Sequence, residues 1–136
     1  MKDLDELILK ELVKNARASN IAIAKKLRVS EGTVRNKINR FIESGVIKSF
    51  TVELSTRKGF KAFSMVEVEK NTDRKLLVPK LKAIDGVVRV FDMAGRIDFM
   101  VEIHTSSPEE FNRAIEEIRA IPKVSDTESM VVLSTN

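Results

Sequence analysis

Apolar residues recur with a helical period in three stretches of the first fifty residues. In the third stretch, residues 30–44, four of them fall at i, i+4, i+7 and i+8, on one stripe of a helix: Val34, Ile38, Phe41 and Ile42. The opposite side carries Asn36, Asn39 and Arg40, which are hydrogen-bonding or cationic. We predict that this helix packs on a core through its stripe and presents a binding face on the other side.

Two shorter helices precede it. Apolar residues at positions 4, 7, 8 and 12 predict a first helix that ends near Asn15, with Asp3 and Glu6 spaced as a capping box. Ser19 is placed to cap a second helix, and its predicted inward residues are Ile23, Ala24 and Leu27.

A tight turn at residues 28–30 joins the second and third helices. Ser30 is placed to cap the third helix, with Glu31 near the positive end of the helix dipole. Arg28 stands where this turn often has glycine, and a positive φ there would cost on the order of 1 kcal/mol. Two short helices joined in this way predict a helix-turn-helix.

The pattern becomes extended beyond the third helix. Gly45 is placed to end that helix, and apolar residues at 46, 47, 50, 52 and 54 predict a linker strand. We expect a helix-turn-helix domain at residues 1–50, a linker strand and hinge at 51–61, and a second domain at 62–136.

The second domain reads strand, helix, strand, strand, helix, strand. Strands are predicted at residues 62–69, 87–93, 97–104 and 124–133. One helix lies within residues 71–84, with Pro79 in its first turn, and the other begins at Ser107 and Pro108 with an apolar face: Phe111, Ala114, Ile115 and Ile118. Apolar matches at an offset of 37 residues indicate two similar half-units. The fold class is therefore α+β, a winged helix-turn-helix followed by a ferredoxin-like βαββαβ domain.

Three methionines bear on how this sheet is used. If the apolar residues at 99, 101 and 103 face the helices, Met100 faces away, and Met65 and Met130 are expected to do likewise. A sheet with helices on one face would leave these methionines exposed to water unless a second subunit covers them. We predict a dimer through the open face; scattered surface methionines without a role are the alternative.

Composition narrows the function classes. Residues 1–50 carry eleven Lys or Arg against six Asp or Glu, whereas the rest of the chain carries thirteen against fourteen, so the basic excess lies in the first domain. The chain has no cysteine and one histidine, which disfavours disulfides, thiolate metal sites and most catalytic relays. We expect no metal, no cofactor and no membrane span, and a cytoplasmic location.

The order of these parts resembles the Lrp/AsnC (feast/famine) transcriptional regulators of bacteria and archaea. The resemblance covers the first helix, the helix-turn-helix, residues 45–54 and the later Gly95-Arg96-Ile97-Asp98. It implies double-stranded DNA and further copies of the chain as partners, with dimers assembling to octamers or other higher oligomers. It also implies an amino acid or related small molecule as effector, bound between effector domains, and control of metabolic promoters.

The third helix and its surroundings supply the candidate DNA contacts. Asn36 suits a bidentate pair with adenine, Arg35 or Arg40 suits guanine or phosphate, and Thr33 suits a thymine methyl group or a phosphate. The full predicted set is Lys25, Lys26, Arg28, Ser30, Thr33, Arg35, Asn36, Lys37, Asn39 and Arg40. A solvated basic face is the alternative.

The resemblance also assigns candidate effector residues: Gly95, Arg96, Ile97, Asp98, Thr127, Glu128 and Ser129. An aspartate can bind an amino group and Arg96 a carboxylate, which suits a zwitterion. Without the resemblance, a hairpin turn that needs glycine and a hydrogen-bonding aspartate is the preferred explanation of Gly95 to Asp98.

Two rival functions stay open on sequence alone. Siroheme decarboxylases resemble the same two-domain architecture and would use basic side chains and His104 on a tetrapyrrole. A metabolite-sensing module whose helix-turn-helix has lost DNA binding is the other.

Overall fold

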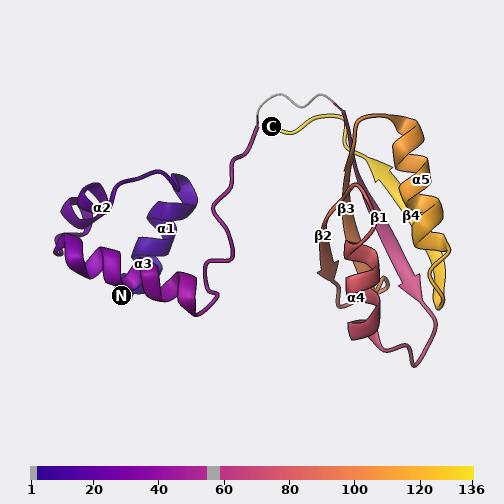
Figure 1. The fold of residues 1–136 in the computed structure, drawn as a ribbon, viewed down its shortest axis with the longest axis horizontal. Coiled ribbons are helices and arrows are strands. Elements are labelled where there is room, and N and C mark those ends of the chain that lie inside the picture. Colours follow the sequence, from indigo (N-terminus) through magenta and orange to yellow (C-terminus); the bar gives the residue numbers. More distant parts are fainter. Residues whose placement is uncertain (1–2, 55–58) are drawn as a thin grey trace. The chain divides into compact units, whose positions relative to one another are not determined.

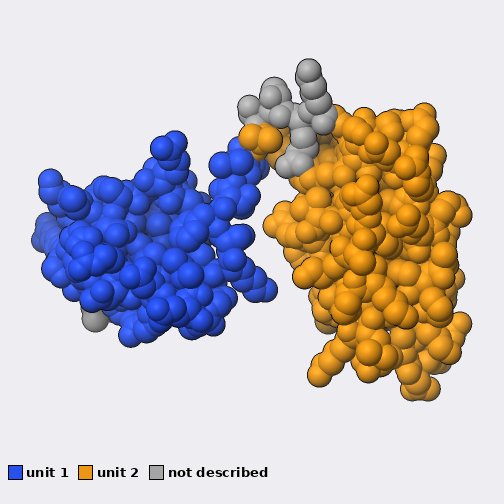
Figure 2. Space-filling view, in the orientation of Figure 1, with its two compact units in different colours: residues 1–53 blue, residues 54–136 orange. Residues whose placement is uncertain are grey.

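The computed structural model describes residues 3–54 and 59–136. The chain divides into two compact units, residues 1–53 and 54–136, shown in blue and orange in Figure 2. The predicted hinge at residues 51–61 spans this division, but residues 55–58 lie outside the described part of the chain, so the hinge stays a prediction.

The first unit consists of three helices: α1 (Leu4–Lys14), α2 (Asn20–Leu27) and α3 (Glu31–Glu43) (Figure 1). Their buried side chains form one cluster, in which Ile8 and Val34 are inaccessible to solvent: Ile8, Leu12, Ile23, Ala24, Val34 and Phe41. The unit therefore has its own core, as the apolar periods predict.

Two details of this unit differ from the prediction. Ile42 is 47% exposed, because eight residues of α-helix place it about 80° from Val34, at the margin of the buried stripe. Asp3 precedes α1 as predicted, but its side chain makes no capping hydrogen bond.

The turn between α2 and α3 agrees with the prediction. Arg28 ends α2 in the left-handed region, at φ 58° and ψ 46°. The Oγ atoms of Ser19 and Ser30 accept hydrogen bonds from the amides of Ala22 and Thr33, at 3.0 and 3.1 Å. Both serine caps are confirmed, and together with the turn they fix where α3 begins.

The described residues of the predicted linker strand do not form a strand. Gly45, at φ +78°, follows the end of α3 as predicted, but residues 48–54 form neither helix nor strand. A strand needs a neighbour for its N–H and C=O groups, and no described segment of this chain pairs with these residues.

The second unit has the predicted βαββαβ order: β1 (Phe60–Val68), α4 (Arg74–Lys82), β2 (Val87–Asp92), β3 (Phe99–Thr105), α5 (Pro108–Arg119) and β4 (Val124–Val131) (Figure 1). The sheet has the order β2-β3-β1-β4, and every neighbouring pair is antiparallel. One cluster joins both helices to the same face of the sheet, with Val66, Leu81, Phe99 and Ile118 among its fully buried members. The strand boundaries lie within two residues of those predicted.

Pro79 does not lie in the first turn of α4. The helix begins at Arg74, one residue after Asp73, whose side chain accepts a hydrogen bond of 3.1 Å from the amide of Lys75. Pro79 is thus the sixth residue of a nine-residue helix. The cap at Asp73 and the burial of Leu77 and Leu81 determine the start of the helix, in spite of the proline.

The three methionines lie on the sheet face away from the helices, as predicted. Met65 pairs with Met100 across β1 and β3, and Met130 on β4 pairs with Phe63. Met130 is 51% exposed, whereas Val101, which faces the helices, is inaccessible. No helix within residues 3–54 or 59–136 is long and apolar enough to cross a membrane.

Candidate functional site

The outward side of α3 gathers four of the predicted DNA-contacting residues. A shallow depression is lined by Thr33, Asn36, Lys37 and Arg40. Asn39 and Arg35 lie exposed on the same helix. A helix lying in a DNA major groove would present such a mixture of amide, hydroxyl and cationic groups to base edges and phosphates.

Acidic side chains hold the cations of this face. Asp5 of α1 forms an ion pair with Lys37 and lies 3.9 Å from Arg40, and Glu31 lies 2.7 Å from Arg35. Exposed pairs such as Arg35–Glu31 are typically worth about 0–1 kcal/mol, whereas Lys37 and Asp5 are partly buried. A phosphate group can therefore replace the carboxylate partner of Arg35 at little cost.

The other predicted contacts flank α3. Lys25, Lys26 and Arg28 are exposed, and Lys26 Nζ donates a 2.8 Å hydrogen bond to Glu11, which lowers the pKa of the Glu11 carboxyl group. Ser30 Oγ is 2.7 Å from the hydroxyl of Thr33 as well as capping the helix. Lys25, Lys26 and Arg28 thus place three exposed cations at the end of α2 and in the turn that leads to α3.

The predicted effector loop joins β2 to β3 at one end of the sheet. Gly95 has φ +145°, with no atom within 4 Å of the position that a Cβ would occupy, so backbone conformation and not space favours glycine there. Arg96 is 72% exposed, and its guanidinium lies 3.6 Å from Glu67. The tip of the loop therefore offers a cation to solvent.

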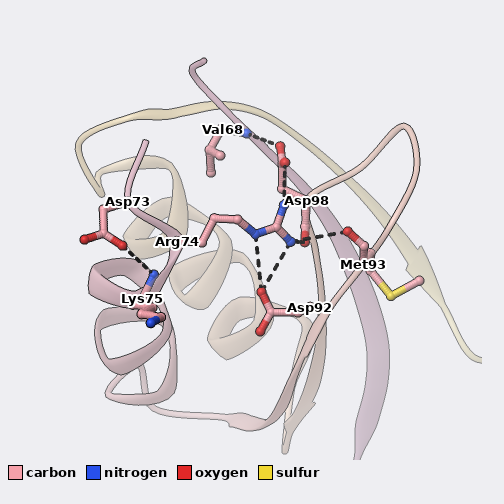
Figure 3. Close-up of polar contacts among 7 residues, drawn as sticks. All are labelled: Val68, Asp73, Arg74, Lys75, Asp92, Met93 and Asp98. Carbon is pink, nitrogen blue, oxygen red and sulfur yellow. Dashed lines mark hydrogen bonds and ion pairs between the residues drawn. The ribbon is translucent and has the colours of Figure 1, made fainter. Parts of the chain in front are cut away.

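Asp98 is engaged within its own domain. Its Oδ2 accepts a 2.8 Å hydrogen bond from the amide of Val68, and its Oδ1 accepts one of 3.0 Å from Arg74 (Figure 3). The β1–β3 ladder ends at Val66 and Phe99. Beyond this pair, the Asp98 carboxylate takes the place of a backbone carbonyl of β3 as the hydrogen-bond acceptor for β1.

Arg74 was not among the predicted site residues. Its guanidinium donates to the carbonyl oxygens of Asp98 and Met93, at 2.5 and 3.3 Å, and to the Oδ1 atoms of Asp98 and Asp92 (Figure 3). It also lies 4.9 Å from the centre of the Phe99 ring. The feature of the sequence that could have pointed to Arg74 is its positive charge at the start of a helix, where the helix dipole disfavours a cation.

The second group of candidate effector residues lies on β4, which β1 separates from β3. Thr127 pairs with Val66, as does Phe99 on the other side, so the two groups lie at the same end of the sheet, two strand spacings or about 10 Å apart. Thr127 accepts a 3.0 Å hydrogen bond from Arg119 of α5, whereas Glu128 faces the open side, opposite Met65. A single chain does not bring both groups around one ligand.

The other end of this sheet has a cleft of about 310 Å³ that contains none of the predicted site residues. It is lined in part by Phe60, His104, Glu110 and Arg113. His104 Nε2 lies 3.1 Å from the buried carboxylate of Glu102. Among residues 3–54 and 59–136, no group of three or more His, Asp or Glu is arranged to hold a metal ion.

Each of the two units matches a known protein family. Residues 1–48 match the model of a winged helix-turn-helix DNA-binding domain. Residues 61–136 match the model of the Lrp/AsnC ligand binding domain, which covers more than half of the chain. The chain belongs to the Lrp/AsnC family.

Relatives of this Lrp/AsnC protein extend over nearly its whole length. The transcriptional regulator LysM of Saccharolobus solfataricus is 36% identical over 131 residues, covering 96% of this chain and 92% of LysM. The solved structure of Escherichia coli AsnC shares the fold with a TM-score of 0.73 at 22% identity, covering 99% and 93% of the two chains. A Neisseria meningitidis regulator solved as a complex with L-methionine has a TM-score of 0.76 at 20% identity, covering 98% and 91%.

These comparisons confirm the fold class and the general function. The Lrp/AsnC protein is a DNA-binding transcriptional regulator with a helix-turn-helix domain and a ligand binding domain. Which of its residues contact DNA or effector stays a prediction.

Proposed function

We propose that this Lrp/AsnC regulator binds operator DNA as a dimer, with α3 of each subunit in successive major grooves about 34 Å apart. The observation that carries the proposal is the depression on α3, where Thr33, Asn36, Lys37 and Arg40 meet on the solvent side of a basic unit. Asn36 and Arg40 read bases, and the exposed cations at 25, 26 and 28 hold the backbone.

The experiment is a binding titration with DNA upstream of the protein's own gene, random DNA as competitor, and several salt concentrations. Asn36→Ala should reduce the preference for operator over random DNA, because amide-to-adenine pairs discriminate by about 1–3 kcal/mol. Lys26→Ala should weaken binding to both DNAs and reduce the salt slope by about 0.9. Lys80→Ala, an exposed lysine on α4 of the other unit, is the control and should change neither.

Equal weakening of both DNAs by Asn36→Ala and Lys26→Ala would contradict the assignment of the reading face. No retardation of any DNA by the wild-type protein at low salt would favour the sensing module that lacks DNA binding.

We further propose that an amino acid is the effector, bound between the loop at residues 95–98 of one subunit and the strand segment at residues 127–129 of another. Support comes from the Lrp/AsnC ligand binding domain, from the exposed Arg96 and from the L-methionine complex of the Neisseria protein. Because one chain separates the two groups by β1, a site that uses both needs a neighbouring subunit. The ligand then favours one assembly over another, which changes the half-sites that dimers occupy together.

Regulation in the cytoplasm, and not catalysis, is the proposed activity. The relatives are named as transcriptional regulators. A Soret-type absorption change on adding haem or siroheme would revive the decarboxylase alternative.

A further inference from the structure

Arg74 occupies a position that its own helix disfavours. It is the first residue of α4, the first turn of which contains no acidic residue. The exposed amides of a helix start carry partial positive charge, so a guanidinium there is repelled unless other groups stabilise it. A cation at such an unfavourable position is expected where a different interaction in the folded protein requires it.

The other interactions converge on one loop. The guanidinium of Arg74 contacts Asp92 and Met93 at the beginning of the β2–β3 connection and Asp98 at its end (Figure 3). Met93 and Asp98 are also joined by a backbone hydrogen bond of 3.0 Å. One side chain therefore ties together both ends of the connection.

Asp98 completes this arrangement from the opposite side. Its amide donates to the carbonyl of Val66 at 3.0 Å, and its Oδ2 accepts from the amide of Val68 at 2.8 Å. Both carboxylate oxygens thus already have a donor from the same domain. An effector ammonium group would have to compete with the Arg74 guanidinium and with a backbone amide for this carboxylate.

The tip of the loop is free of these restraints. Arg96 is exposed, it forms an ion pair with Glu67 at the longer distance of 3.6 Å, and a side chain at Gly95 would meet no atom within 4 Å. The loop thus has a fixed base and an accessible cationic tip, which suits recognition of a ligand carboxylate.

We propose that Arg74 and Asp98 are positioning residues: they hold the loop at residues 93–98 in its binding conformation, and the Asp98 carboxylate does not contact the effector. Arg96 takes the carboxylate of the amino acid, and groups other than Asp98 take its ammonium. The part that concerns binding rests on the proposed effector site.

Two readouts test the proposal on the full-length protein: amide hydrogen exchange at Met93 and Asp98, whose amides donate backbone hydrogen bonds at the base of the loop, and binding of each of the 20 common amino acids by calorimetry. Arg74→Ala should accelerate exchange in the loop at least tenfold relative to α5, and raise the dissociation constant of any amino acid that the wild type binds at least tenfold. Arg74→Lys should not rescue either readout, because an ammonium group cannot donate to four acceptors in the planar arrangement of a guanidinium. Arg113→Ala, at an exposed arginine of α5 outside this network, is the control and should change neither.

A combined variant separates positioning from direct contact. If Asp98 acts through Arg74, the two substitutions should not add: the double variant Arg74→Ala/Asp98→Asn should bind the amino acid about as tightly as the single variant with the lower affinity. If Asp98 holds the ammonium itself, Arg74→Ala should leave affinity unchanged or improved while Asp98→Asn alone abolishes binding, which would overturn the proposal. A wild-type protein that binds none of the amino acids would reject the proposed effector and the binding part with it, and unchanged loop exchange in Arg74→Ala would reject the positioning role itself.

Discussion

Arg28 meets two opposing requirements at a single residue. Its left-handed backbone, at φ 58°, favours glycine, whereas its exposed side chain, three residues before α3, is a predicted contact to the DNA backbone. Arg28→Gly should raise the free energy of unfolding by about 0.5–1 kcal/mol, since the strain is relieved but the unfolded chain gains freedom. It should also lower affinity for all DNA sequences and reduce the salt slope by about 0.9 if the guanidinium contacts a phosphate.

Arg28→Asn is the matched control for this prediction, because asparagine tolerates the left-handed region and carries no charge. Both variants should lose the same amount of DNA affinity in titrations at several salt concentrations. Unchanged affinity in both would show that Arg28 has no phosphate contact.

Residue-level reasoning succeeded at α2, at α3 and at the turn between them, where each side chain acts through its own helix. The caps at Ser19 and Ser30 and the conformation of Arg28 followed from the sequence because each depends on neighbours within a few residues. Arg74 could not be found in that way, since its partners lie 18 to 24 residues along the chain and meet only when β2 and β3 pair.

At the scale of elements, α4 carries an unfavourable residue within it. Pro79 lacks the N–H group that would bond to the carbonyl of Lys75, and it is exposed. Pro79→Ala should stabilise the protein by about 2 kcal/mol. A proline inside a helix costs about 3 kcal/mol relative to alanine. Alanine also gives the unfolded chain more conformational entropy, which lowers the stability by up to about 1 kcal/mol. Lys80→Ala, one position later, is the control and should change the denaturant midpoint little. A Pro79→Ala protein that is less stable than the wild type would mean that the proline ring makes packing contacts that stabilise α4.

The start of α5 is stabilised by a charge. The hydroxyl and the amide of Ser106 donate to Glu110 at 2.7 and 3.0 Å and lower the pKa of its carboxyl group. A lowered pKa in the folded state adds stability above the ordinary pKa of glutamate, and this stability is lost as the pH falls through the lowered value. Ser106→Ala should therefore be less stable than the wild type at neutral pH, and the two should converge in acid.

Chemical denaturation at a series of pH values measures this difference. Ser125→Ala, an exposed serine near the start of β4, should show no such dependence. A gap between wild type and Ser106→Ala that persists unchanged into strong acid would mean that Glu110 is not stabilised in its ionised form.

At the scale of the whole molecule, the order of elements was predictable and the linker was not. The sequence displays directly the apolar periods that predict the alternating burial of β1 and β3 and the buried stripe of α5: Phe111, Ala114, Ile115 and Ile118. The extended residues 48–54 show the same apolar enrichment, but a strand also needs a partner, which no period specifies. The candidate sites divide likewise: the candidate DNA-binding face follows from one helix, α3, whereas the candidate effector residues lie in the β2–β3 loop and on β4, and β1 separates β3 from β4.

We predict that the open face of the sheet forms the dimer contact. Met65 and Met100 pair at its centre, Phe91 pairs with Met100, and Met130 lies half exposed on the edge strand β4. A second copy covering this face would bury all four side chains together. Met130→Lys should therefore raise the dimer dissociation constant at least tenfold in sedimentation velocity, because burying a charged group in an apolar contact costs free energy.

Leu76→Lys gives a matched control, since Leu76 is 65% exposed on α4, on the helix side of the same sheet. It should leave the dimer intact, and neither change should alter the circular dichroism of the monomer. Loss of the dimer should weaken binding to a two-half-site operator while binding to a single half-site is retained, because each α3 still reads its own groove. A Met130→Lys protein that remains dimeric at the wild-type dissociation constant would place the dimer contact elsewhere than on this face.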